Sequence, residues 1–141
     1  MVVTLVATIG GLTAYFGIDS YRQYAFHSDR DLLVTALQHA RAQAVGNICL
    51  PTASGCTDGK SHGVAVFANS FVVYQGTSST TRDSDVDAVI NANPNTTRTG
   101  ASDFAFTQLS ATSSGGTITL TDSSTGREST ITVGTEGEIS W

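Results

Sequence analysis

The chain has 141 residues and a formal net charge of −5, with 13% charged and 40% hydrophobic residues. This length fits one domain with an attached segment, and the composition is too apolar for a disordered chain. Residues 46–141 carry nine acidic and four basic side chains. General binding to nucleic acid or anionic lipid is disfavoured, because phosphate recognition needs clustered Lys and Arg.

The first 18 residues are uncharged, and the first charge is Asp19. As a helix they would measure about 27 Å, just enough to cross a bilayer. The stretch lacks the basic region and small-residue cleavage site of a signal peptide. Three interpretations remain: a membrane anchor, a buried core helix, or a packing stem in an assembly. Gly10, Gly11 and Gly17 favour close helix–helix packing over a lone anchor.

Helical periodicity continues as far as residue 45. Tyr21, Tyr24 and Phe26 lead into an apolar stripe. The stripe consists of Leu32, Leu33, Ala36, Leu37, Ala40 and Ala44. A glycine at position 46 then predicts the helix end. We expect one helix over about residues 1–45, whose apolar first half projects and whose amphipathic second half lies against a head.

Beyond residue 46 the pattern changes to short apolar runs with a period of two, which is typical of half-buried antiparallel strands. Strands are predicted at 48–50, 64–67, 71–74, 104–106, 118–120, 131–133 and 139–141, with Trp141 ending a core-facing strand. Residues 75–102 are predicted as a long polar loop that faces solvent or a neighbouring subunit. The predicted fold class is α+β: a long N-terminal helix packed on an antiparallel β-sheet or β-sandwich head.

Cys49 and Cys56 are the two cysteines of the chain. Two cysteines make a poor zinc site, because structural zinc requires four ligands. A disulfide fits better, and closing this eight-residue loop would stabilise the fold by about 2.5 kcal/mol. Such a bond implies an oxidising compartment.

Asp83, Asp85 and Asp87 have the oxygen spacing with which calcium-binding loops begin. A complete loop of that kind needs Gly at its sixth and Glu at its twelfth position, where this chain has Ala88 and Pro94. A solvated acidic loop is the main interpretation, and calcium is retained as a weak alternative. No other metal or cofactor is expected.

No sequence motif points to catalysis. His27, His39 and His62 are scattered along the chain, and the signatures of zinc hydrolases, serine hydrolases, P-loop proteins and CxxC redox proteins are missing from the sequence. We therefore predict no catalytic residues, no small-molecule substrate and no enzymatic activity.

The order of parts and one segment resemble a known family. Leu37–Val45, which reads LQHARAQAV, is similar to the LxxARxxAV helix end of the H-type pseudopilin/FimT group in the type IV pilin superfamily. The segments Cys49–Pro51, Gly63–Phe67 and Ser129–Ile139 are similar to the strand, sheet and closing hairpin that follow in that group. The resemblance covers nearly the whole chain and is most specific over residues 37–67.

The resemblance implies a structural subunit, a minor pilin or pseudopilin of a type IV pilus or type II secretion filament. It implies a single-pass inner-membrane location before assembly and a periplasmic or extracellular filament afterwards. The expected partners are other pilin subunits. The implied parts are a transmembrane and filament-core helix over 1–27, an amphipathic helix over 28–46 and a head over 47–141. The implied assembly residues are Val2, Val3, Leu5, Val6, Ile9, Gly10, Leu12 and Phe16.

Two departures from the family pattern qualify this expectation. Pilins carry a Gly cleavage site and an acidic residue near the start of the helix, so we expect the sequence to begin inside that motif. DNA-binding FimT-type proteins have arginines in the last hairpin, where this chain has Gly137-Glu138-Ile139. Nucleic-acid binding is therefore not implied.

Two alternative functions remain open at this stage. One is a major pilin that forms the filament shaft. The other is a tip adhesin or a DNA-uptake subunit used in natural competence, which would bind through the 75–102 loop. A basic patch would favour the second alternative, if the fold brought together Lys60, Arg82, Arg98 and Arg127.

Overall fold

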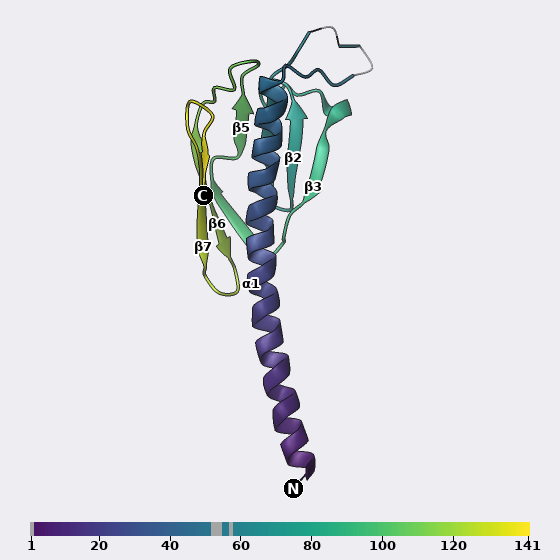
Figure 1. Cartoon of the computed structure of the whole chain (residues 1–141), viewed down its shortest axis with the longest axis vertical. Helices are drawn as coiled ribbons and strands as arrows, with labels where there is room; N and C mark the ends of the chain where they lie inside the picture. The colour runs from purple at the N-terminus through teal and green to yellow at the C-terminus, as the bar shows by residue number, and fades with distance from the viewer. Residues whose placement is uncertain (1, 52–54, 57) are drawn as a thin grey trace.

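The computed structural model describes residues 2–51, 55–56 and 58–141, with the side chains described from residue 20 onward. One helix, α1, runs from Val2 to Val45 and precedes all of the strands. The strands are β1 His62–Val66, β2 Ser70–Gln75, β3 Ala88–Asn91, β4 Thr96–Gly100, β5 Asp103–Phe106, β6 Gly116–Asp122, β7 Glu128–Val133 and β8 Ile139–Ser140. Figure 1 shows α1 crossing in front of the strands, with its first half extending beyond them.

The strands form two four-stranded antiparallel sheets. The first has the order β3-β2-β1-β5 and the second the order β4-β6-β7-β8. In the β1–β2 hairpin Val64 pairs with Val73, and in the β6–β7 hairpin Ile118 pairs with Ile131. The predicted α+β class, with a helix on antiparallel sheets, is thus confirmed, while the role of α1 as a stem remains a prediction.

The second half of α1 supplies one wall of the core. Phe26, Leu33, Leu37, Ala40 and Ala44 are buried at spacings that keep them on one helix face. The two sheets contribute the opposing core residues Val64, Val66, Phe71, Val73, Phe104, Phe106, Ile118, Leu120, Ile131 and Val133. Among the described side chains of α1, burial against the head thus begins at Phe26.

Three predictions about the strands are wrong. Residues 48–50 form no strand, although they are hydrogen-bonded to the head. The 75–102 segment is not one long loop, since it contains a 3-10 helix (η1, Ser84–Val86), β3 and β4. Trp141 does not face the core: it is exposed, and Ile139 packs against the core instead.

The structure contradicts the predicted localisation. Within the described part of the chain, no helix is both long enough and apolar enough to span a bilayer. From Ser20 onward α1 carries Arg22, Asp29 and Arg30, and charges at this density cannot be placed in hydrocarbon. The side chains of residues 1–18, on which the prediction rested, lie outside the described ones. The predicted location, single-pass in the inner membrane before assembly and periplasmic or extracellular afterwards, is therefore not retained.

Candidate functional site

An exposed aromatic surface lies where α1 leaves the head. Tyr21 is 71% exposed, Tyr24 73% and Leu32 40%, although Leu32 belongs to the apolar stripe that is predicted to face the head. Tyr24, Ser28 and Leu32 follow one another at intervals of four residues, so they form a single ridge along the helix. We call Tyr21 together with this ridge the tyrosine ridge.

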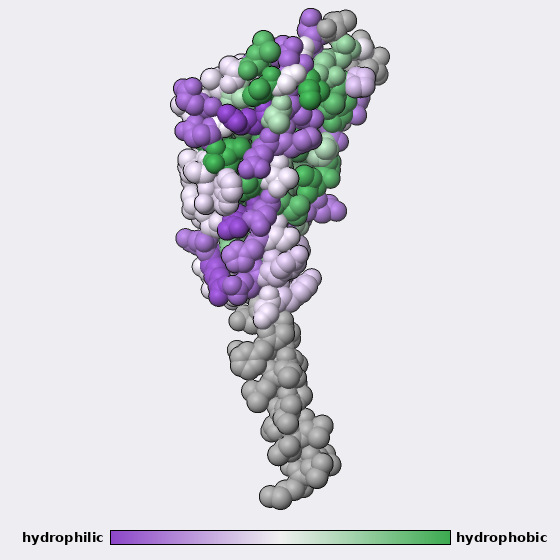
Figure 2. Space-filling view, viewed as in Figure 1, coloured by the Kyte–Doolittle hydropathy of each residue, from purple (hydrophilic) through white to green (hydrophobic). Residues whose placement is uncertain are grey.

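Two shallow hollows flank the tyrosine ridge. One has a volume of about 220 Å³ and is bordered on its far side by Ala25 and Asn93. The other, of about 250 Å³, is bordered by His27, Asp31 and Thr35. Figure 2 shows pale, near-neutral surface over this part of α1 and hydrophobic surface beside the helix near β3. Helices pack by placing the ridges of one into the grooves of the other, so a ridge between two grooves suits packing against a second helix.

A buried ion pair fixes this part of α1 to the head. Nη2 of Arg98 donates a hydrogen bond of 2.5 Å to Oδ2 of Asp29, and the main-chain N–H of Asn93 donates one of 2.7 Å to Oδ1. Nη1 of Arg98 donates to the carbonyl oxygens of Ala68 and Thr96, over 2.6 Å and 2.9 Å. The two side chains are 1% (Asp29) and 4% (Arg98) exposed.

The ion pair joins four parts of the chain: α1, the β1–β2 turn, the segment before β4, and β4 itself. The guanidinium of Arg98 also lies over the ring of Phe71, 5.1 Å from its centroid. A buried charge is tolerated when it is paired and hydrogen-bonded, and both Nη groups of Arg98 are bonded here. Because Asp29 lies between Tyr24 and Leu32 in sequence, the pair holds the tyrosine ridge in one orientation on the head.

Beyond the other end of α1, a disulfide between Cys49 and Cys56 closes a short loop. The segment that leads into it is fixed to β2, since the main-chain N–H of Leu50 donates to Oε1 of Gln75 over 2.7 Å. Nε2 of Gln75 donates to Oδ2 of Asp83 over 3.0 Å. The predicted disulfide is thus present in the structure.

Replacing Cys49 with serine should destabilise the head by about 2–3 kcal/mol, because the unfolded chain regains the freedom of an eight-residue loop. Thermal melting with and without a reducing agent checks this. The melting temperature of the parent chain should fall on reduction, whereas that of the variant should not change. Equal melting of the parent chain under both conditions would contradict a stabilising disulfide.

His62 is fully buried beside this segment. Its Nε2 lies 2.9 Å from the carbonyl oxygen of Ile48, and its buried Nδ1 has no hydrogen-bond partner among the described residues. Burial lowers the pKa of His62 below its ordinary 6.5, the hydrogen bond to Ile48 opposes this shift, and His39 adds a smaller lowering. Burial therefore favours the neutral ring, whose Nε2 can donate to the carbonyl of Ile48.

Stability should fall as the pH drops below about 6.5, because the unfolded state then binds a proton that the folded state resists. The midpoint of urea unfolding, measured between pH 7.5 and pH 5, checks this. His62→Gln should flatten the dependence, while His39→Gln, a change at an exposed histidine, should leave most of it. A parent midpoint that stays constant over this range would exclude the effect.

The predicted calcium candidates are not assembled into a site. Asp83 accepts a hydrogen bond from Gln75, and Asp87 pairs with Nε of Arg82 over 2.7 Å. Asp85 is exposed on η1. Among the described residues, no group of three or more His, Cys, Asp or Glu side chains could hold a metal ion. The weak calcium interpretation is therefore not retained.

The other predicted functional residues divide into two groups. The assembly residues lie in the helical part of α1 before residue 19, and their side chains lie outside the described ones. These are Val2, Val3, Leu5, Val6, Ile9, Gly10, Leu12 and Phe16. Of the four bases considered for a basic patch, Arg98 is buried against Asp29 and Arg82 is paired with Asp87.

Comparison of the chain with protein-family models, with curated proteins and with solved structures finds no match. What the chain does is therefore inferred from its own residues.

Proposed function

We propose that the chain is a structural subunit of a pilin-like helical filament, of the type IV pilus or type II secretion class, and acts as a minor pilin or pseudopilin. The tyrosine ridge is the observation that carries this proposal. Two exposed tyrosines and a half-exposed leucine line one helix face between two grooves, at the point where the helix leaves its head. Exposed aromatic and aliphatic side chains on a ridge between grooves are typical of a protein–protein contact.

The arrangement of α1 supports assembly through the helix. Its second half is fixed by the core and by the Asp29–Arg98 pair, whereas its first half extends beyond the strands (Figure 1). The sequence of that first half is uncharged as far as Ile18. Packing α1 helices of several copies side by side would cover both the uncharged half and the tyrosine ridge. The helix residues from Val2 to Phe16 are included in this proposal as packing residues.

Replacing Tyr24 with aspartate should reduce the amount of chain recovered in filaments at least tenfold, because a carboxylate buried between helices without a partner costs several kcal/mol. The measurement is sedimentation of filaments from the producing cells, followed by detection of the chain. Circular dichroism of the purified variant should show an unchanged fold, because Tyr24 is 73% exposed.

Leu109→Asp is the matched control, since Leu109 is 64% exposed and its N–H donates to the carbonyl of Ala44, at the opposite end of α1 from the ridge. It should assemble like the parent chain. If Tyr24→Asp assembled as well as Leu109→Asp, the helix-packing role of the tyrosine ridge would be excluded. If the parent chain entered no filament, the function itself would be excluded.

A further inference from the structure

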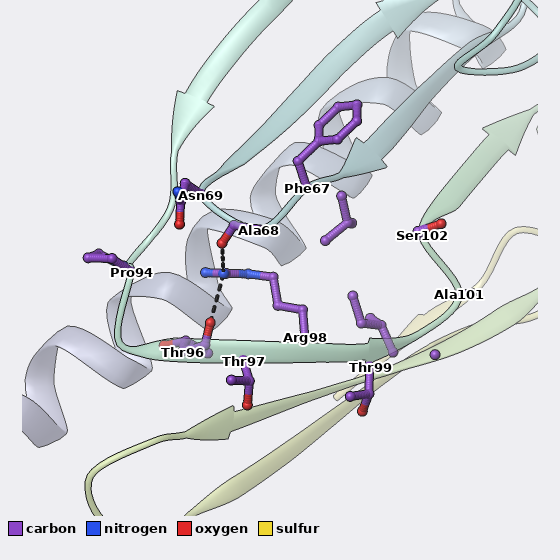
Figure 3. Close-up of a pocket in the computed structure, with 13 residues that line it drawn as sticks. Phe67, Ala68, Asn69, Pro94, Thr96, Thr97, Arg98, Thr99, Ala101 and Ser102 are labelled. Carbon is purple, nitrogen blue, oxygen red and sulfur yellow. Dashed lines mark hydrogen bonds between the residues drawn. The ribbon is translucent and has the colours of Figure 1, made fainter.

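A second surface, separate from the tyrosine ridge, lies along β4. A cavity of about 390 Å³ is bordered on one side by residues 96–102 and on the other by residues 66–69. Pro94 and Ile118 complete its lining. Figure 3 shows Arg98 rising from β4 into this space, with Ala68 and Thr96 as partners of its guanidinium. The volume is within the range of ligand-binding pockets.

β4 is an edge strand, and its pairing with β6 determines which of its main-chain groups are free. The N–H of Ser123 donates to the carbonyl of Asn95, and that of Ala101 donates to Thr117. Hydrogen-bonded pairs alternate along an antiparallel ladder, so the odd-numbered residues of β4 face β6. The N–H and C=O groups of Arg98 and Gly100 therefore point away from β6, toward the open edge.

Both ends of this edge are already occupied. The N–H of Thr96 donates to Asn93, and the carbonyl of Thr96 accepts from Arg98 Nη1. At the other end, the carbonyl of Ser102 accepts the N–H of Val66 over 2.8 Å. The open edge thus consists of the main-chain groups of two residues, Arg98 and Gly100. An extended segment of about four residues is long enough to pair with both.

The side chain of Arg98 contributes a further unsatisfied group. Although the side chain is 4% exposed, its Nε has no hydrogen-bond partner among the described residues. A buried donor without a partner costs about 1–3 kcal/mol. A ligand oxygen placed in the cavity could relieve this cost, because Arg98 lines the cavity.

We propose that the open edge of β4 and the adjoining cavity form a docking groove for an extended, uncharged peptide segment of a partner protein. The segment would add a short strand to β4 by main-chain hydrogen bonds to Arg98 and Gly100. Phe67, which is 46% exposed, forms part of the opposite wall. This groove is additional to the proposed helix packing and does not depend on it.

The chemistry of the groove selects this ligand. The charge of Arg98 is already balanced by Asp29, so an acidic peptide would find no unpaired positive charge in the groove. The other lining residues are uncharged, with small or apolar side chains such as Ala101 and Ile118. The wall formed by residues 66–69 stands beside the edge, so a single extended segment fits there better than a whole sheet of a second copy.

The test uses the full chain and a blocked, uncharged pentapeptide, acetyl-Ser-Val-Thr-Val-Ser-amide. Its addition up to about 1 mM should shift the amide ¹H–¹⁵N signals of Arg98 and Gly100 saturably. Two methylated peptides test the pairing: one carries N-methyl groups on its second and fourth residues, the other on its third and fifth. One of the two should lose binding and the other should keep it, because alternate amides face β4.

Phe67→Asp should weaken peptide binding at least tenfold, whereas Leu109→Asp, a change at another exposed apolar residue, should not alter it. Equal binding of both methylated peptides, or no shift at Arg98 and Gly100 in the folded parent chain, would overturn the proposal. Shifts of these two signals with protein concentration alone would also overturn it, since they would assign the edge to a second copy.

Discussion

Replacing Asp29 with alanine should lower the free energy of unfolding by about 3–5 kcal/mol, because it leaves the guanidinium of Arg98 buried without its counter-charge. The variant also loses the hydrogen bond from the N–H of Asn93 to Asp29, and this loss adds to the destabilisation. Urea unfolding of the parent chain and the variant measures the difference.

A matched control separates burial from charge. Arg30 and Asp31 form an ion pair on the same helix, with the Asp31 side chain 60% exposed. Asp31→Ala should cost less than about 1 kcal/mol, since water solvates the remaining charge. If Asp29→Ala and Asp31→Ala cost the same, the Asp29–Arg98 pair would not be the contact that holds α1 on the head.

A double replacement tests the same contact from the other side. Asp29→Leu combined with Arg98→Met removes both charges, so the double variant should be more stable than Asp29→Ala alone. Its Tyr24 should nevertheless be held less firmly in orientation, because the directional hydrogen bonds are gone. Hydrogen exchange of the helix around residue 24 would report this loosening.

Replacing Gly63 with alanine should cost about 2–3 kcal/mol or more. A Cβ at this position would lie 2.6 Å from the carbonyl oxygen of Phe104 and would also collide with the hydroxyl end of Tyr74. Gly63 pairs with Tyr74 across β1 and β2, and the Tyr74 ring occupies the space that a side chain would fill. Differential scanning calorimetry of the variant should show a lower melting temperature.

The collision matters because Tyr74 also secures the segment before η1. The hydroxyl of Tyr74 donates to Oδ1 of Asp103 over 2.5 Å, and Oδ2 accepts the N–H of Ser79 over 2.9 Å. Burial and this carboxylate raise the pKa of Tyr74 well above its ordinary value, so the hydroxyl remains a donor. Thr99→Ala, on an exposed strand position, is the control and should change stability by less than about 0.5 kcal/mol. Phe104 lies on β5, beside Gly63 on β1. If Gly63→Ala were as stable as this control, β1 and β5 would be able to move apart without cost, and the predicted collision would be wrong.

The elements predicted from the sequence are those with a strong period. The stripe from Leu32 to Ala44 predicts the helix face that packs on the head, although Leu32 itself is 40% exposed. The apolar runs around Val64, Phe104 and Ile118 predict three strands. β3 and β4 carry no such signal: β3 is largely exposed, and β4 consists of Thr, Arg and Gly. The polar stretch 75–102 therefore predicts a loop, although it contains these two strands.

The candidate sites were less accessible to prediction. Asp29 and Arg98 lie 69 residues apart, and no local pattern indicates that they pair. Tyr21 and Tyr24 lead into the predicted apolar stripe, and their exposure depends on where burial against the head begins, at Phe26. The predicted contact that is confirmed is the Cys49–Cys56 disulfide. It could be predicted because its two residues are close in sequence and because only cysteine forms such a bond.

Electron cryo-microscopy of the native assembly tests the central proposal most directly. The account predicts that this chain is found in a helical filament, with α1 helices side by side and the tyrosine ridge of one copy covered by a neighbouring helix. Repetition along the shaft would make it the major subunit, and occurrence at an end would make it a minor one. Filaments that exclude the chain, or in which Tyr21 and Tyr24 face solvent, would contradict the proposal.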